Sequence, residues 1–295
     1  MANFDDLLNN SPAEQNHTQL SKEEYSAKKK SERDAVFELS DNTALEVAAD
    51  SGMFCQYLDV QSNFDRYSAV NTLLIMAQMP EATRIADFDT WKNKGGYVKT
   101  GETAISILEP HEYTKEDGAP GTGYNIKKVF DVSQVDTRRI KPAPALPTYT
   151  DRQLLQALIS KAPMKISGVE NLSGNLGAYT DPDTGEVFVR KGMEFADSFR
   201  SVAQELCYAE AQRDGNNTAD PSFTAYSAAY ILCKKYGVES KDFDFETAPG
   251  MFRGFEAKDI KQELTAIRDA ADSISGRMVK HLDAVSRAVK SQDER

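Results

Sequence analysis

The chain has few of the side chains that bind transition metals or form disulfides. Its 295 residues include three histidines and three cysteines, and both kinds are scattered along the sequence. No His/Cys cluster with the spacing of a zinc site is present, so the sequence predicts neither a bound metal nor a cofactor. An odd number of cysteines in apolar settings is typical of reduced core thiols, which favours a cytoplasmic protein.

Long apolar runs and excess positive charge are also lacking. No apolar run approaches the roughly 18 residues of a membrane-spanning helix, and the polar N-terminus lacks a signal-peptide core. The formal net charge of −11 argues against a protein that coats duplex DNA, because phosphate neutralisation requires Lys and Arg. The sequence therefore predicts no membrane partner, and any contact with nucleic acid requires a local basic groove.

One predicted helix has the spacing of a zinc-peptidase helix without its ligands. In the pattern His-Glu-x-x-His, two imidazoles one turn apart hold Zn²⁺, and the Glu beside them is the general base for metal-bound water. In residues 195–209, Glu205 keeps the position of the base, whereas Gln204 and Tyr208 stand at the ligand positions. An amide and a phenol replace two imidazoles, so the sequence predicts no catalytic residue and no metal here.

The segments on either side of this helix extend the pattern. Residues 177–190 predict a β-hairpin around a Pro- and Gly-containing turn, and residues 223–237 predict a second helix. A hairpin followed by two helices resembles the peptidase domain of the ArdC antirestriction family and of LtrC-like proteins of conjugative elements. That family usually carries a third, acidic ligand on the second helix, where this chain has Tyr226. The resemblance implies that Gln204, Tyr208 and Tyr226 lie together and fill a degenerate metal site.

Two other interpretations of the first helix stay open. Its apolar residues recur at helical spacing, which an ordinary amphipathic helix also requires. An enzyme that had kept activity by other means would have only Glu205 and Tyr208 as an acid/base pair. A lone carboxylate and a tyrosine with a pKa of about 10 supply no electrophile, which disfavours this interpretation.

A second signature runs through the N-terminal half of the chain. It begins with a predicted helix that contains Asn71 and Gln78, continues through Trp91 and a Gly-Gly pair, and ends in a Phe-Asp-Val-x-Gln strand at residues 130–134. These features stand in the same order as in the N-terminal domain of the ArdC family. The resemblance covers roughly residues 35–137. It implies a domain that binds single-stranded DNA.

The chemistry of the residues after Trp91 also favours such binding. A single strand is held by aromatic rings that stack on bases, within a groove whose cations follow the phosphates. Trp91 and Tyr97 stand here around glycines that allow close approach of a strand, although the family tends to have a basic residue near Tyr97. The alternative is that Trp91 belongs to the core. The basic residues predicted to contact DNA are Lys92, Lys94, Lys99, Arg138 and Arg139.

Composition, spacing and the resemblance to the ArdC family together divide the chain into five parts of an α+β fold. A chain of 295 residues favours two domains, each of about 100–150 residues. The second domain is predicted to be zincin-like, with a helix pair and a small antiparallel sheet. The predicted parts are a disordered tail (1–30), an ArdC-like single-stranded DNA-binding domain (31–137), a Pro-rich linker (138–150), a degenerate zincin-like domain (151–254) and a C-terminal helix (255–295).

The C-terminal helix has an apolar seam with heptad-like spacing. Such a seam either packs against the body of the protein or forms a two-chain coiled coil. In the second case the protein is a homodimer, or it binds a protein partner through this helix. The seam residues are Ile260, Leu264, Ile267, Ala271, Ile274, Met278, His281 and Val285.

Together these features predict a single-stranded DNA-binding protein of a mobile genetic element, such as a plasmid or transposon. Its expected role is in antirestriction or conjugation, and its metallopeptidase-like domain is expected to be a pseudoenzyme. The alternative is a protein–protein interaction scaffold that does not bind DNA. The feature that discriminates them is whether Trp91, Tyr97 and the nearby lysines share one exposed face.

Overall fold

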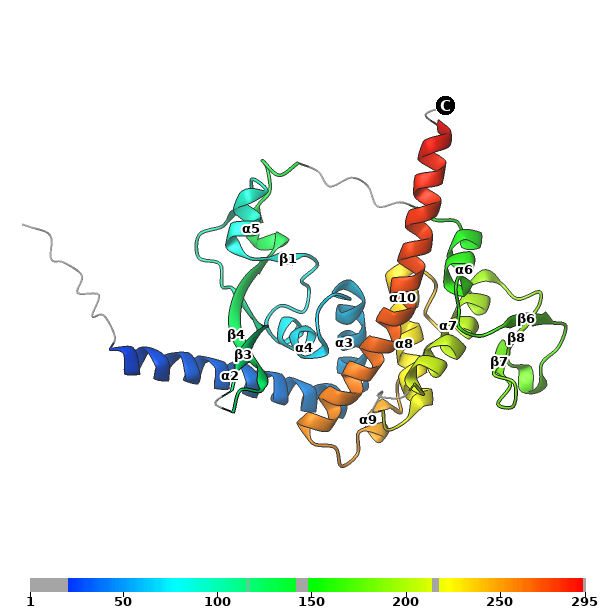
Figure 1. The fold of residues 1–295 in the computed structure, drawn as a ribbon, viewed down its shortest axis with the longest axis horizontal. Coiled ribbons are helices and arrows are strands. Elements are labelled where there is room, and N and C mark those ends of the chain that lie inside the picture. The colour runs from blue at the N-terminus through cyan, green and yellow to red at the C-terminus, as the bar shows by residue number, and fades with distance from the viewer. Residues whose placement is uncertain (1–20, 116, 142–147, 214–217, 294–295) are drawn as a thin grey trace, which may run out of the picture.

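The chain folds into two groups of elements that lie along one long C-terminal helix, as Figure 1 shows. The computed structural model describes residues 21–115, 117–141, 148–213 and 218–293. We call residues 21–141 the N-terminal unit and residues 148–254 the C-terminal unit. The predicted α+β fold class is confirmed, including its small sheets and the long last helix. None of the helices in the described ranges combines the length and apolar character needed to cross a membrane.

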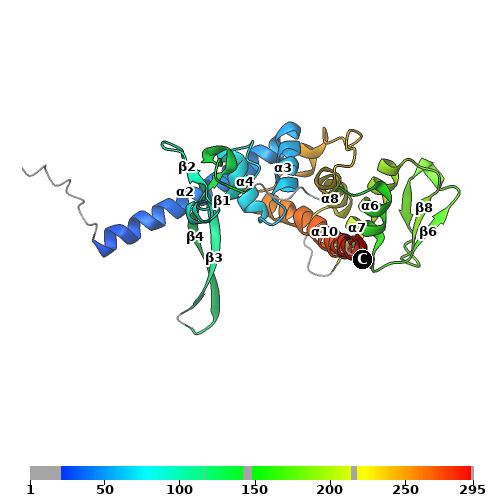
Figure 2. The ribbon, with the colours of Figure 1, turned by 90° about the horizontal axis from the view of Figure 1, so that it is seen from above.

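The N-terminal unit combines four helices with a small antiparallel sheet. This sheet has the strand order β1-β4-β3, and β2 and β5 form a separate antiparallel pair. Figure 2 shows β3 and β4 leaving the body as a long two-stranded arm. The elements are α2 (Lys22–Ala49), α3 (Ser51–Asn63), α4 (Ala69–Gln78), β1 (Ile85–Ala86), α5 (Phe88–Asn93), β2 (Tyr97–Val98), β3 (Ile105–Thr114), β4 (Pro120–Asp131), a 3₁₀ turn (Val132–Gln134) and β5 (Val135–Asp136).

The C-terminal unit packs a three-stranded sheet and a short helix against a helix pair. The predicted hairpin is present as β7 and β8, and β6 adds one parallel pair beside β8. Two helices follow the hairpin in the predicted order. The elements are α6 (Asp151–Ile159), β6 (Ile166–Val169), a 3₁₀ turn (Ser173–Asn175), β7 (Ala178–Thr180), β8 (Val187–Arg190), α7 (Phe195–Ala211), α8 (Pro221–Tyr236), α9 (Ala248–Met251) and then α10 (Ala257–Asp293).

The start of α2 corrects the predicted disordered tail. Residues 22–30 are helical, whereas residues 1–20 lie outside the described part of the chain. The helix begins at a capping box, in which the Glu24 amide donates to the Ser21 hydroxyl at 3.2 Å and the Ser21 amide donates to the Glu24 carboxylate at 2.8 Å. Ser-x-x-Glu is a readable start signal, and the lysine run that follows it had suggested a solvated tail.

Two amide side chains on one face of α4 complete the free edge of β3. Asn71 Nδ2 donates to the Leu108 carbonyl at 2.9 Å, and the Leu108 amide donates to Asn71 Oδ1 at 2.8 Å. Gln78 makes the same pair of bonds with Ser106, at 3.0 and 2.9 Å. These bonds satisfy backbone groups that an edge strand would otherwise leave unpaired. Asn71 and Gln78, which belong to the N-terminal signature, are therefore scaffold residues.

The end of β4 is fixed by another pair of signature residues. The buried Asp131 carboxylate accepts hydrogen bonds from the backbone amides of Thr83, Arg84 and Ser133, each at 2.8 Å. Burial disfavours the charged form, but these amides outweigh it and hold the pKa of Asp131 below its ordinary value. Gln134 Oε1 accepts from the Asp131 amide at 2.9 Å. The Asp-Val-x-Gln segment is thus a turn that anchors β1 and β5 to β4.

The two units share one hydrophobic core. Phe54 of α3 packs against Phe223, Phe245 and Phe252 of the C-terminal unit, with ring centroids 5.3, 5.4 and 5.7 Å apart. The buried cluster runs without interruption from α2 through α8 to α10. Burial of large aromatic rings dominates the stability of such an interface.

The apolar seam of α10 packs against the body of the protein. Ile260, Leu264, Ile267 and Met278 are at most 1% exposed, and the helix contacts α2, α4, α6, α7 and α8. Leu282, which is 2% exposed, continues the seam in place of the predicted His281. The seam is therefore used within this chain as far as residue 282.

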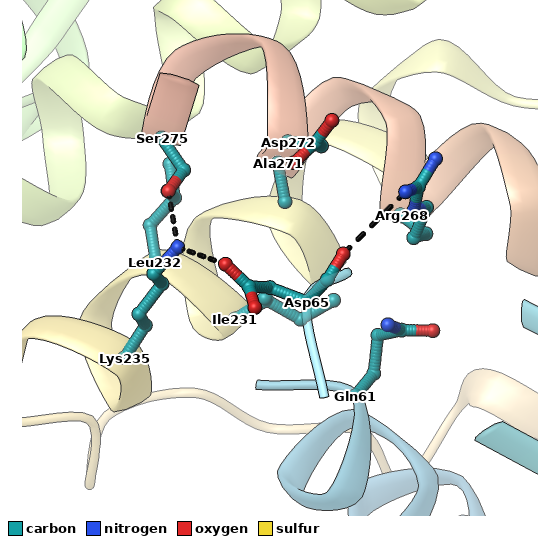
Figure 3. Close-up of a pocket in the computed structure, with 9 residues that line it drawn as sticks. All are labelled: Gln61, Asp65, Ile231, Leu232, Lys235, Arg268, Ala271, Asp272 and Ser275. Carbon is teal, nitrogen blue, oxygen red and sulfur yellow. Dashed lines mark hydrogen bonds and ion pairs between the residues drawn. The ribbon is translucent and has the colours of Figure 1, made fainter. Parts of the chain in front are cut away.

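A partly buried ion pair also ties the two units to α10 (Figure 3). Lys235 on α8 pairs with the Asp65 carboxylate of the N-terminal unit and donates to the Ser275 hydroxyl at 2.5 Å. Arg268 on α10 donates to the Asp65 carbonyl at 3.5 Å. One loop after α3 is thus held by side chains from α8 and α10.

The pairing of α4 with β3 predicts a specific loss of stability. Asn71→Leu keeps the approximate size of the side chain and leaves two backbone groups of Leu108 unpaired. Each unsatisfied buried group costs about 1–3 kcal/mol, so we expect the free energy of unfolding to fall by about 2 kcal/mol or more. Denaturant titration followed by circular dichroism measures this fall, with Asn125→Leu at an exposed position of β4 as the control. Equal unfolding midpoints for the two variants would contradict the role of Asn71.

Candidate functional site

A pocket of about 480 Å³ lies between α7, β7 and the start of α8. We call it the α7 pocket and define it by Gln204, Glu205, Tyr208, Thr180 and Ser222. Gln204 and Tyr208 are one turn apart on α7, so they project to the same side, as predicted. The Thr180 hydroxyl on β7 donates to the Glu205 carboxylate at 2.5 Å. Glu205 is thus hydrogen-bonded, as its partial burial requires.

Tyr226 does not line the α7 pocket, so the prediction that it joins Gln204 and Tyr208 is wrong. Its ring packs against Phe243 and Phe245, with centroids 4.8 and 5.3 Å away. Its hydroxyl accepts a hydrogen bond from the Asp244 amide at 2.7 Å. This tyrosine stabilises the loop after α8.

Ser222, one turn before Tyr226, lines the α7 pocket instead. Sequence reasoning missed this residue because both positions recur on α8 with helical spacing, and the rotation of α8 against α7 decides which one faces the pocket. The first turn of α8 is positioned by Asp220, whose carboxylate accepts from the Ser222 amide at 2.8 Å. Ser222 is exposed, which leaves its hydroxyl open to a ligand.

The α7 pocket offers hydrogen-bonding groups but few metal ligands. Among the described residues that line it, Glu205 is the only carboxylate. The ranges that the structure describes contain no group of three or more His, Cys, Asp or Glu side chains that could hold a metal ion. His111 lies on β3 and His281 on α10, whereas His17 falls outside these ranges. The pocket can orient a polar ligand, and it supplies no evident electrophile.

Trp91 belongs to the core, so its predicted role as a stacking platform is wrong. It is 1% exposed, and its indole Nε1 donates to the Phe130 carbonyl at 2.8 Å. The cationic groups of Arg84 and Lys94 lie over the ring, 5.2 and 5.7 Å from its centroid. The indole therefore joins α5 to β4, and a nucleotide base has no access to its face.

Tyr97 is an exposed aromatic residue of this region. It begins β2 opposite Asp136 of β5, and its side chain is 51% exposed. Together with Asp136, Arg138 and Arg139 it lines a cleft of about 370 Å³, which we call the Tyr97 cleft. Lys92, by contrast, lies on α5 and does not line this cleft, although it is exposed nearby.

The Gly-Gly pair positions the arginines of the Tyr97 cleft. Gly95 has a φ of +86°, and a Cβ on it would lie 2.9 Å from the Arg139 carbonyl oxygen. A Cβ on Gly96 would lie 2.8 Å from the side chains of Ile140 and Val135. Gly95 therefore admits the backbone of residue 139 and Gly96 admits two side chains of this chain, where the sequence had suggested the approach of a DNA strand. Residues 138–140 pack on the N-terminal unit, whereas the rest of the predicted linker includes residues 142–147, which lie outside the described ranges.

The two arginines of the Tyr97 cleft differ in whether their charge is paired. The Arg138 guanidinium pairs with Asp136 at 2.5 Å, and it holds the pKa of the Asp136 carboxyl at about 2. Both groups are therefore ionised at neutral pH and largely neutralise each other. Arg139 makes no ion pair within the described residues. Lys99 directly follows β2, and its ammonium group donates to the Ser133 carbonyl at 2.7 Å.

Comparison with known proteins identifies the N-terminal unit. Residues 46–139 match the family described as the N-terminal domain of anti-restriction factor ArdC. The N-terminal unit is ArdC-like. This match agrees with the resemblance seen in the sequence of residues 35–137.

The solved structure of the antirestriction ArdC protein of plasmid R388 has a similar fold. Its Mn(II)-bound form is 16% identical to this chain, covers 82% of it and 97% of the R388 protein, and superposes with a TM-score of 0.56. The metal-free form is 18% identical over 72% of this chain and 86% of the other, with a TM-score of 0.49.

One curated relative is an uncharacterized protein of Bacillus anthracis. It is 22% identical over 77% of this chain and 48% of the relative. The chain therefore spans about half the length of the curated relative that it matches.

The geometry of the α7 pocket predicts which substitutions create a metal site. Gln204→His, Tyr208→His and Ser222→Glu together place two imidazoles and a second carboxylate around it, and we expect about one Zn²⁺ per chain to be retained. The matched control carries the same two histidines with Tyr226→Glu, which points away. Elemental analysis after gel filtration reads out both proteins. Equal zinc retention by the two variants would show that Ser222 is not the third position.

Proposed function

We propose that this chain binds single-stranded DNA through the Tyr97 cleft and serves a mobile genetic element in antirestriction or conjugation. The observation that carries the proposal is an exposed tyrosine ring in one cleft with two arginines. An aromatic face stacks on a base of any sequence, and guanidinium groups pair with the flanking phosphates. The printed name of the R388 relative, an antirestriction protein of a plasmid, supports the assignment to a mobile element.

The charge distribution favours a single strand over a duplex. Because Asp136 largely neutralises Arg138, Arg139 is the main source of positive charge within the cleft, with Lys92, Lys94 and Lys99 exposed on nearby segments. A protein of net charge −11 gains little long-range attraction for a densely charged duplex. Stacking is therefore expected to supply much of the affinity, and only unpaired bases present their faces to Tyr97.

Titration of a labelled single strand tests the proposal directly. We expect Tyr97→Ala to weaken binding by about 5- to 150-fold, the equivalent of the 1–3 kcal/mol typical of one stacked base. Tyr97→Phe keeps the ring and should bind like the parent protein. The control is Tyr179→Ala, which removes another exposed tyrosine, beside the α7 pocket. Fluorescence anisotropy at low salt measures all four proteins.

Two further measurements complete this test. Arg139→Gln is expected to reduce the slope of log K against log salt by about 0.7, the value for one phosphate contact on a single strand. A matched duplex is expected to bind more weakly than the single strand. The proposal fails if no strand binds at low salt, or if Tyr179→Ala weakens binding as much as Tyr97→Ala.

We also infer that the α7 pocket is a metallopeptidase-like site without catalysis. The R388 relative is named as Mn(II)-bound. At the α7 pocket the described residues present two amides, two phenols, two hydroxyls and a single carboxylate. One carboxylate among neutral donors holds a divalent cation poorly, and without a metal the pocket has no means of activating a water molecule as a nucleophile.

A second candidate function is that of a protein–protein scaffold that acts through α10. Figure 1 shows the end of this helix extending beyond both units, and Val279 on it is 42% exposed. A partner helix or a second copy of the chain would pack on this end. Sedimentation of the full chain and of a chain truncated after residue 283 tests this function. A dimer that dissociates on truncation favours it, and a monomer in both cases excludes a homodimer through this end.

A further inference from the structure

A second cleft opens where α2 and α10 pass the root of the β3–β4 arm, and it has a volume of about 540 Å³. We call it the Arg66 cleft and define it by Phe37, Arg66, Ser68, Tyr124 and Arg268. These residues come from α2, the segment before α4, β4 and α10. The described residues that line this cleft and the Tyr97 cleft do not overlap. The arrangement in this cleft is therefore a separate feature of the fold.

The polar side of the Arg66 cleft is suited to an anion. Arg66 is exposed and makes no ion pair among the described residues. Arg268 Nη1 pairs with Asp269 at 2.7 Å and its Nη2 donates to the Asp65 carbonyl at 3.5 Å, whereas its Nε is buried without a hydrogen-bond partner in the described structure. Two guanidinium groups with unused donors are the preferred partners of phosphate oxygens.

The start of α4 adds to this positive potential. Ser68 is the N-cap of the helix, and its hydroxyl oxygen accepts from the Asn71 amide at 3.3 Å. The hydroxyl proton remains available to a ligand. Helix N-termini carry a partial positive charge, which acts here together with Arg66 on the same cleft. The positive potential of Arg66 and of the α4 N-terminus is thus confined to this cleft within a protein of net charge −11.

The other side of the Arg66 cleft is aromatic. Phe37 and Tyr124 meet edge to face, with centroids 6.0 Å apart and an interplanar angle of 85°. This contact holds Tyr124 in place while 40% of its surface stays exposed. A planar ring can therefore stack on Tyr124, whose position is already fixed.

The floor of the Arg66 cleft is rigid. Asn71 and Leu108 line it, and they are joined by the two hydrogen bonds that attach α4 to β3. The cleft is therefore formed before a ligand arrives, and binding requires little reorganisation.

We propose that the Arg66 cleft binds one nucleoside phosphate unit, with the phosphate between Arg66 and Arg268 and the base against Tyr124. A free nucleotide and a single nucleotide within a DNA strand present the same chemistry to these residues. The cleft is thus a second nucleotide subsite, and its existence does not depend on the Tyr97 cleft.

Calorimetric titration of the full chain with thymidine monophosphate tests the proposal, with thymidine and inorganic phosphate as the two partial ligands. The complete nucleotide should bind at least about tenfold more tightly than either part, because each part makes only one of the two contacts. Arg66→Ala should weaken its binding by about 10- to 150-fold and Tyr124→Ala by about 5- to 150-fold. Tyr124→Phe, which keeps the ring, and Arg152→Ala, at an exposed site on α6, should bind like the parent chain.

Two comparisons assign the source of the nucleotide. If a saturating single strand displaces thymidine monophosphate, the cleft takes a nucleotide of that strand, and if both bind together it takes a free nucleotide. Tyr97→Ala should retain the binding of thymidine monophosphate, so failure of the Tyr97 cleft leaves this result intact. The proposal is overturned if the nucleotide does not bind, or if Arg66→Ala binds it as tightly as Arg152→Ala does.

Discussion

The attachment of β3 to α4 is the constraint on which the N-terminal unit depends. Two amide side chains, Asn71 and Gln78, pair with the backbone of β3 and fix its register against the helix. The register of β3 then fixes β4, because the two strands pair along the whole of β3. β4 in turn presents the Phe130 carbonyl that holds Trp91. These successive hydrogen bonds thus connect the first helices of the unit to the segment that carries Tyr97.

The N-terminal sequence signature therefore contains two kinds of residue: those that hold the fold together and those that are exposed to a ligand. Asn71, Gln78, Trp91 and Asp131 are the most recognisable residues of the N-terminal unit, and all four make side-chain hydrogen bonds to the backbone. The groups available to a ligand are less distinctive. Tyr97 and the arginines are ordinary exposed residues whose position follows from the close approach of residue 139 to Gly95.

The order and type of the elements could be read from the sequence, and their mutual orientation could not. The hairpin, α7, α8 and the last helix all follow from turn residues and apolar spacing. Whether Ser222 or Tyr226 faces the α7 pocket depends on the rotation of α8 about its axis. Apolar spacing leaves this rotation undetermined, because both residues are near the same face of the helix. The burial of Trp91 depends on a carbonyl that is distant in sequence. Long-range contacts of this kind leave no recognisable pattern in the neighbouring sequence.

The account rests most directly on Tyr97 as the residue that meets a base. A single strand with one 5-iododeoxyuridine crosslinks on irradiation to an aromatic ring that stacks on it, and mass spectrometry of the digested complex identifies the ring. The account predicts an adduct at Tyr97, which is the exposed aromatic residue of its cleft. Adducts confined to Tyr179 or Tyr208 beside the α7 pocket would contradict it, and would move the DNA-binding site to the C-terminal unit.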